Sequence, residues 1–199
     1  FDFASFTLKY IRDNGDGFTI DATSHSQTSL MQAVLNEFAK LNISLEPSMK
    51  HITHDTPFEV NLSLAQDYAS VINATYTALA RFRAKLMGCM SPLVIWSHHF
   101  DMAFIWFATN DTDEHQDPHI AIGFAPFSEG IDRPYFYGYG WSKETGYIEV
   151  ELDPPSQAIT EGYTGLYAEY DTLHTVDNFN QVIEDMLLAY QRKASILLK

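Results

Sequence analysis

The pattern of apolar and polar residues in the first forty positions predicts a β-hairpin followed by a helix. Aromatic and β-branched residues fill positions 1–11 and 18–22, and the segment between them, DNGDG, contains two Asn/Asp-Gly pairs of the kind that form tight turns. Ser26 is a suitable N-cap for a helix over about residues 27–41, because apolar residues recur there every three or four positions.

The middle of the chain predicts a short strand and then the longest helix. Residues 43–45 have strand composition, and Pro47 would end such a strand. An apolar stripe with helical spacing runs over about residues 64–87, and basic side chains cluster at its C-terminal end, where they suit the helix dipole. Gly88 is a natural C-terminal cap for this helix.

Short apolar or alternating runs dominate the second half of the chain and predict a block of strands. Strands are expected at residues 93–96, 100–107, 119–124, 135–139, 147–152 and 163–170. Apolar residues with helical spacing then predict a last helix from about residue 176.

This order of elements predicts an α+β fold, in which a mainly antiparallel sheet has three helices packed on it. Consecutive strands with short connections pair antiparallel, and helices at the edges of a strand block argue against alternating βαβ units. We expect one domain over residues 1–199; two half-sheets around the long helix are the alternative. Because the chain starts with Phe1, inside an expected strand, we also expect that an N-terminal segment is missing.

Charge and cysteine content narrow the expected partners. The 26 acidic residues outnumber the 12 basic ones, which gives a net charge of −14. The electrostatic field of such a negatively charged protein repels nucleic acid and anionic membrane surfaces, so neither is an expected partner. No apolar run is long enough to span a bilayer. Cys89 is the only cysteine and can form no internal disulfide, which favours a reducing, cytoplasmic location.

The sequence His98-His99-Phe100-Asp101 is the sharpest cluster of reactive side chains. On a strand, His99 and Asp101 share a face and His98 points to the other face. Imidazoles and carboxylates are common metal ligands. Further ligands would have to come from elsewhere, and the candidates are His115, His119, Glu129 and Glu161. The alternatives are catalysis without a metal, or a turn in which Asp101 only hydrogen-bonds backbone amides.

Aromatic side chains are the second feature of the strand block. They include Trp96, Trp106, Tyr135, Phe136, Tyr137, Tyr139 and Trp141. Alternation places Tyr135, Tyr137 and Tyr139 on one face of a strand. Such a face can line an apolar pocket with hydroxyl groups, or it can be ordinary sheet core.

Glu129 and Glu161 each lie in a turn next to a glycine. They would form an acid–base pair only if the fold brought them within several ångströms of each other, and the alternative is that both are solvated. No phosphate-binding glycine motif is present, which disfavours the usual nucleotide cofactors and leaves the cofactor unassigned.

Two stretches resemble a known family. They are SPLVIW at residues 91–96, followed by FDMA at 100–103, and RPYFY at 133–137, with GFAP upstream at 123–126. Together with an aromatic segment before the last helix, they resemble the uncharacterised family DUF5996 of bacteria and fungi. The resemblance implies that this chain covers about the C-terminal two-thirds of a longer family member, and it implies no particular activity.

We therefore hypothesise a small-molecule-binding protein or enzyme with an aromatic-lined pocket. The expected catalytic residues are His99, Asp101 and Glu129. The expected ligand-binding residues are Trp96, His98, Tyr135, Tyr137, Trp141 and Glu161. The alternatives are a non-enzymatic protein-interaction domain, which includes a homo-oligomer, and a metal-dependent hydrolase.

Overall fold

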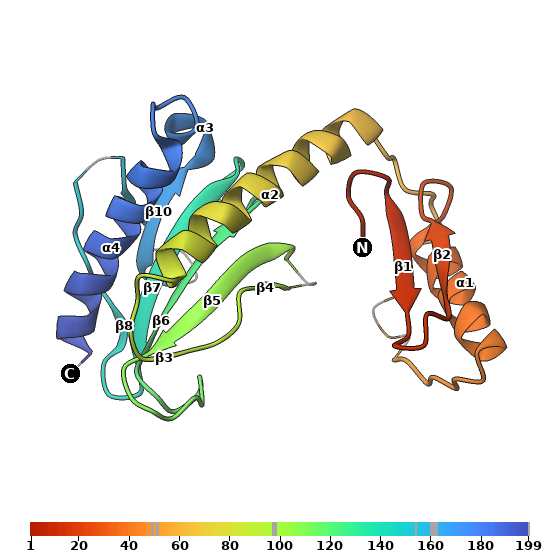
Figure 1. The fold of residues 1–199 in the computed structure, drawn as a ribbon, viewed down its shortest axis with the longest axis horizontal. Helices are drawn as coiled ribbons and strands as arrows, with labels where there is room; N and C mark the ends of the chain where they lie inside the picture. The colour runs from red at the N-terminus through yellow and green to blue at the C-terminus, as the bar shows by residue number, and fades with distance from the viewer. Residues whose placement is uncertain (49, 51, 97–98, 154, 160–162, 199) are drawn as a thin grey trace. The chain divides into compact units, whose positions relative to one another are not determined.

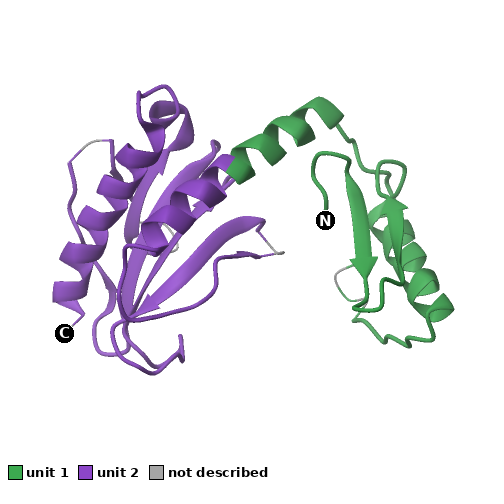
Figure 2. Ribbon diagram, viewed as in Figure 1, with its two compact units in different colours: residues 1–73 green, residues 74–199 purple. Residues whose placement is uncertain are grey.

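The chain forms two compact units, Phe1–Asn73 and Ala74–Lys199 (Figure 2). The structure is a computed structural model and describes residues 1–48, 50, 52–96, 99–153, 155–159 and 163–198. Each unit has its own antiparallel sheet, and both contain helices (Figure 1), so the α+β class is confirmed. The prediction of a single domain stays a prediction, because a compact unit need not be an independently folding domain.

The first unit contains the expected hairpin and helix. Strand β1 (Thr7–Ile11) pairs with β2 (Gly17–Asp21), and helix α1 (Gln27–Lys40) follows. Ser26 caps the helix as expected: its Oγ accepts a hydrogen bond from the Ser29 amide at 3.1 Å, and the Ser29 Oγ accepts one from the Ser26 amide at 2.8 Å. Phe38 of α1 packs edge-on against aromatic rings of both strands, so α1 covers this small sheet.

The strand expected at residues 43–45 is wrong, because helix α1 ends there in a tight turn. Asn42 adopts a left-handed conformation (φ 57°), and the Ile43 amide donates back to the Phe38 carbonyl at 2.9 Å. The next helix, α2 (Leu62–Arg83), also ends earlier than expected. Gly88 has a φ of 108° and lies between α2 and the following strand, so it does not cap this helix.

The second unit is built on a sheet of eight strands. They are β3 (Cys89–Met90), β4 (Val94–Trp96), β5 (Asp101–Phe107), β6 (His119–Ala125), β7 (Tyr135–Ser142), β8 (Gly146–Ile148), β9 (Gln157–Ile159) and β10 (Gly165–Glu169). Their order is β3-β5-β6-β7-β10-β9, with β4 paired to β5 and β8 paired to β7, and every pair is antiparallel. Six of these strands were expected; β3 and β9 are too short to give a periodic signal.

Helices cover one face of this sheet. The short helix α3 (Tyr170–Leu173) and α4 (Phe179–Leu197) contact it (Figure 1), and the C-terminal part of α2 does so through Phe82, whose ring lies 5.9 Å from that of Phe104 on β5. The sheet presents the rings of Phe104, Phe124 and Phe136 to them, each at most 1% exposed. Burying these large apolar side chains provides most of the favourable free energy of this interface. None of the helices in the described part of the chain is long and apolar enough to cross a membrane.

A buried carboxylate joins two of these helices. The side chain of Glu184 on α4 is 0% exposed and forms salt bridges with Arg81, at 2.5 Å, and with Lys85. Its hydrogen bond with Lys85, followed by the contributions of Arg81, holds the pKa of Glu184 below its ordinary value of 4.5. A charge is stable at this position because both of its oxygens have cationic partners.

We predict that this interaction makes the second unit sensitive to acid. Because the folded-state pKa of Glu184 is lowered, its stabilisation is complete above about pH 4.5 and is lost as the pH falls through the folded-state pKa. Glu184→Gln removes the charge. It should lower the free energy of unfolding at pH 7 and flatten its dependence on pH between about 6 and 3. Urea unfolding at several pH values measures both effects, and an unchanged slope would contradict this role.

Candidate functional site

The face of the large sheet opposite α2, α3 and α4 contains a cavity of about 370 Å³. It is lined by Trp96, His99, Asp101, Ala103, Ile105, Glu114, Ala121, Ala125, Ser128, Tyr135, Tyr137, Tyr139 and Tyr163. This volume lies within the usual range for small-molecule sites, and the lining combines aromatic rings with a few polar groups, as such sites commonly do.

Small residues on the central strands create the space. On β6, Ala121 and Ala125 face the cavity, and on β5 Ala103 does so. The residues of β6 that alternate with them, Ile120, Ile122 and Phe124, are large and fully buried on the helix-covered face. The side chains of β6 are therefore large on the helix-covered face and small on the other face, where they form part of the floor of the cavity.

Gly123 allows the side chain of Tyr137 to lie across strand β6. The two residues are paired across β6 and β7, and a Cβ atom at position 123 would lie 2.7 Å from the Tyr137 hydroxyl. Without a side chain there, the Tyr137 ring reaches over β6 to β5, and its hydroxyl donates a hydrogen bond to Asp101 Oδ2 at 2.7 Å. A glycine on one strand thus permits a contact between its two neighbours.

Tyrosines from β7 and from the segment before β10 form the walls. The rings of Tyr137 and Tyr139 are nearly parallel, at 7° with centroids 6.5 Å apart. The ring of Tyr163 meets that of Tyr139 at 60° and 5.2 Å. Further along β7, the Tyr135 hydroxyl forms a 2.5 Å hydrogen bond with the Ser128 hydroxyl. One pair of rings is therefore nearly parallel and another is steeply inclined, and together they present several aromatic faces and hydroxyls to one space.

A tight turn carries His99 and Asp101 to the same cavity. Strand β4 pairs with β5 so that Trp96 lies opposite Asp101, and the Phe100 amide donates to the Trp96 carbonyl at 2.7 Å. Phe100 is left-handed (φ 55°), a conformation that is uncommon outside glycine and that reverses the chain here. Because paired residues of antiparallel strands share a face, Trp96 and Asp101 stand on the same wall.

The tyrosine hydroxyls at this site stay protonated at neutral pH. Burial, followed by the nearby Asp101 carboxylate and their hydrogen bond, raises the pKa of Tyr137 well above its usual value. Burial, followed by its proximity to Tyr135, raises the pKa of Tyr163. Burial, followed by the proximity of Tyr147 and of the Glu114 and Asp101 carboxylates, raises the pKa of Tyr139 to about 12. The phenols are therefore neutral hydrogen-bonding groups, and an imidazole and a carboxylate next to them are suited to proton transfer.

The structure brings together five of the residues that the sequence analysis selected. Trp96, His99, Asp101, Tyr135 and Tyr137 all line the cavity.

The other four selected residues are placed differently. Glu129 is exposed in a turn before β7, outside the cavity lining, although its neighbour Ser128 lies in it. Trp141 stands at the far end of β7 and packs against His119, with ring centroids 5.4 Å apart. His98 and Glu161 lie outside the described residues, and the roles expected for all four stay predictions.

Besides Ile105 and the alanines of the floor, three lining residues were not candidates in the sequence analysis: Glu114, Ser128 and Tyr163. Glu114 and Ser128 lie in connections between strands, where there is no periodicity to assign a face. Tyr163 was expected to start a strand over residues 163–170, but β10 begins at Gly165 and Tyr163 lies in the connection before it. The floor of the cavity could have been predicted from the sequence, because large and small apolar residues alternate along His119–Ala125 (HIAIGFA). That alternation indicates one packed face and one hollow face of the same strand.

Among the residues that the structure describes, no group of three or more His, Cys, Asp or Glu side chains is placed to hold a metal ion. His119, one of the candidate ligands, is 5% exposed, and its Nδ1 hydrogen-bonds the Asp117 carbonyl at 2.8 Å. Two other candidates, His98 and Glu161, lie outside the described residues, so the metal-dependent hydrolase stays an untested alternative.

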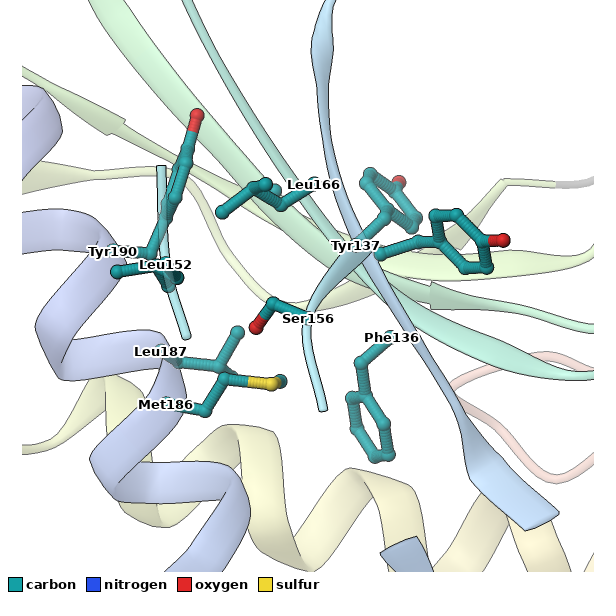
Figure 3. Close-up of a pocket in the computed structure, with 10 residues that line it drawn as sticks. Phe136, Tyr137, Leu152, Ser156, Leu166, Met186, Leu187 and Tyr190 are labelled. Carbon is teal, nitrogen blue, oxygen red and sulfur yellow. The ribbon is translucent and has the colours of Figure 1, made fainter. Parts of the chain in front are cut away.

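A much smaller cavity, of about 10 Å³, lies on the helix-covered side of β7 (Figure 3). Leu187 and Tyr190 of α4 and Leu166 of β10 are among the residues around it. Since it has room for roughly one water molecule, it is a packing defect and not a ligand site.

Comparison with known proteins gives a family but no activity. A model described as a family of unknown function, DUF5996, matches residues 1–197. The chain belongs to this family. The match covers essentially the whole of this DUF5996 chain, so it does not support the expectation that the chain is the C-terminal part of a longer member. No curated protein and no solved structure matches it.

We predict that the tyrosine cluster makes this DUF5996 chain sensitive to alkali. The pKa of Tyr139 is raised from 10 to about 12, so between these values the unfolded chain loses a proton that the folded chain keeps, and stability falls as pH rises. Tyr139→Phe should remove part of this loss, roughly 1–2 kcal/mol. Urea unfolding between pH 9 and about 12 measures it. Tyr76→Phe, at a ring that is 51% exposed, is the control and should keep the wild-type slope.

Proposed function

We propose that this protein binds a small organic molecule in the tyrosine-lined cavity of the large sheet. The observation that carries the proposal is that Trp96, His99, Asp101 and the tyrosines of β7 line one cavity of about 370 Å³. A sheet face that served only as core would be filled by its own side chains, because protein interiors are close-packed. Here alanines of β5 and β6 border the cavity, and a volume of about 370 Å³ stays open.

The polar groups support specific recognition. The Tyr137 hydroxyl and the Asp101 carboxylate form a hydrogen-bonded pair within the lining, and the Ser128 and Tyr135 hydroxyls form another. Since these bonds fix the orientation of the groups before any ligand arrives, little ordering is required on binding. His99 and Asp101 would also support acid–base catalysis on a bound substrate.

The test is a fragment screen by two-dimensional NMR on the full chain, with neutral, anionic and cationic compounds. Ala121→Leu inserts a larger side chain into the floor and should weaken binding of the hits at least about tenfold. Ala158→Leu makes the same change at an exposed position of β9 and should leave affinity unchanged. If no fragment perturbs the resonances of the cavity, or if both variants bind equally well, the proposal is wrong.

One observation favours a second candidate, a protein-interaction surface. Strand β4 and its turn expose apolar side chains: Val94 is 38% exposed, Trp96 40% and Phe100 44%. Clustered exposed apolar residues are typical of contact surfaces. Light scattering tests for a homo-oligomer, and Val94→Glu should abolish any self-association that uses this surface.

We also propose a cytoplasmic location for this protein, from its single cysteine, and no nucleic-acid or membrane partner, from its net charge of −14. Like the ligand, these remain proposals.

A further inference from the structure

We propose that the cavity selects an organic cation, either a quaternary ammonium group or a protonated amine. This inference rests on the proposed function and specifies the charge of its ligand.

Two carboxylates supply negative charge to the cavity, and the imidazole of His99 is the one basic side chain among its described lining residues. The carboxylates of Asp101 and Glu114 line it, and no lysine or arginine occurs among the described lining residues. Both carboxylates act on the same phenol, since both contribute to the raised pKa of Tyr139. A cation placed near that ring would therefore be attracted by two negative charges, and an anion would be repelled.

The two carboxylates also differ from the buried one in the same unit. Glu184 is neutralised by Arg81 and Lys85. Within the described part of the chain, no salt bridge involves Asp101 or Glu114. Asp101 accepts one hydrogen bond from Tyr137, and a carboxylate has about four acceptor positions, so it keeps capacity for a ligand.

The aromatic walls suit the same ligand. Trp96, Tyr137, Tyr139 and Tyr163 come from three separate segments, and two of the rings meet at 60°. Cations are attracted to the faces of tryptophan and tyrosine rings, and cages of such rings bind quaternary ammonium groups. Because the phenols remain neutral at pH 7, they do not compete with the carboxylates for the positive charge.

The test compares three probes of nearly equal shape and different charge. Choline is the cation, 3,3-dimethylbutan-1-ol is its neutral carbon isostere, and 3,3-dimethylbutanoate is a related anion. We expect NMR titration of the full chain at pH 7 to show choline binding about five- to tenfold more tightly than the neutral alcohol, with no binding of the anion. Raising the salt concentration should weaken only the binding of choline.

Substitutions of single carboxylates test whether Asp101 and Glu114 cause the preference for a cation. Asp101→Asn and Glu114→Gln should each weaken choline binding about fivefold and weaken binding of the neutral alcohol by clearly less. Glu144→Gln makes the same change in net charge in the exposed turn between β7 and β8 and should have no effect. Glu114 is exposed, so its variant tests the inference even if the substitution of Asp101 disturbs the fold.

The results separate this inference from the proposed function. If the neutral alcohol binds as tightly as choline, or if all three carboxylate variants behave alike, the inference is overturned and the cavity remains a small-molecule site. If none of the three probes binds while uncharged or anionic fragments from the wider screen do, the inference is likewise overturned. If no compound of any charge binds, both proposals fail.

Discussion

The architecture of the second unit depends on one strand, β6, that satisfies two different packing demands. Its large residues, Ile120, Ile122 and Phe124, are buried against the helix-covered side. On the other face its residues are small, and Gly123 has no side chain, so the Tyr137 ring from β7 can lie across β6 and reach β5. Because successive side chains on a strand point to opposite faces, a single seven-residue segment specifies both a core and a hollow. The cavity is a consequence of this alternation more than of any one polar residue.

Much of this fold could be predicted from the sequence, because the signals are local. The Asn-Gly and Asp-Gly pairs identified the hairpin, Ser26 identified the start of α1, and alternation identified most strands. The strand predicted at residues 43–45 was wrong, because three residues of strand composition are a weak signal. The hydrogen bonds that close the end of helix α1, here from the Ile43 amide to the Phe38 carbonyl, determine the backbone conformation instead. Strands such as β9 exist only because a longer neighbour pairs with them, and no local pattern reports that.

The site was predictable only in part, for the same reason. Trp96, His99, Asp101 and the β7 tyrosines lie on strands or in a tight hairpin, so their faces follow from periodicity. Glu114 and Tyr163 are brought to the cavity by loops, and the path of a loop depends on contacts that are distant in sequence. The hydrogen bond from Tyr137 to Asp101 spans 36 positions and requires the register of three strands to be known.

The short strands at the margins of the large sheet limit how copies of this chain can associate. In the part of the chain that the structure describes, the large sheet ends at β9 on one side, with three residues, and at β3 and β4 on the other, with two and three. Each border therefore offers few backbone donors and acceptors to an incoming segment, and sheets with such borders resist growth by strand addition. Association through the described borders of the large sheet would therefore depend on side chains at its surfaces more than on extension of the sheet.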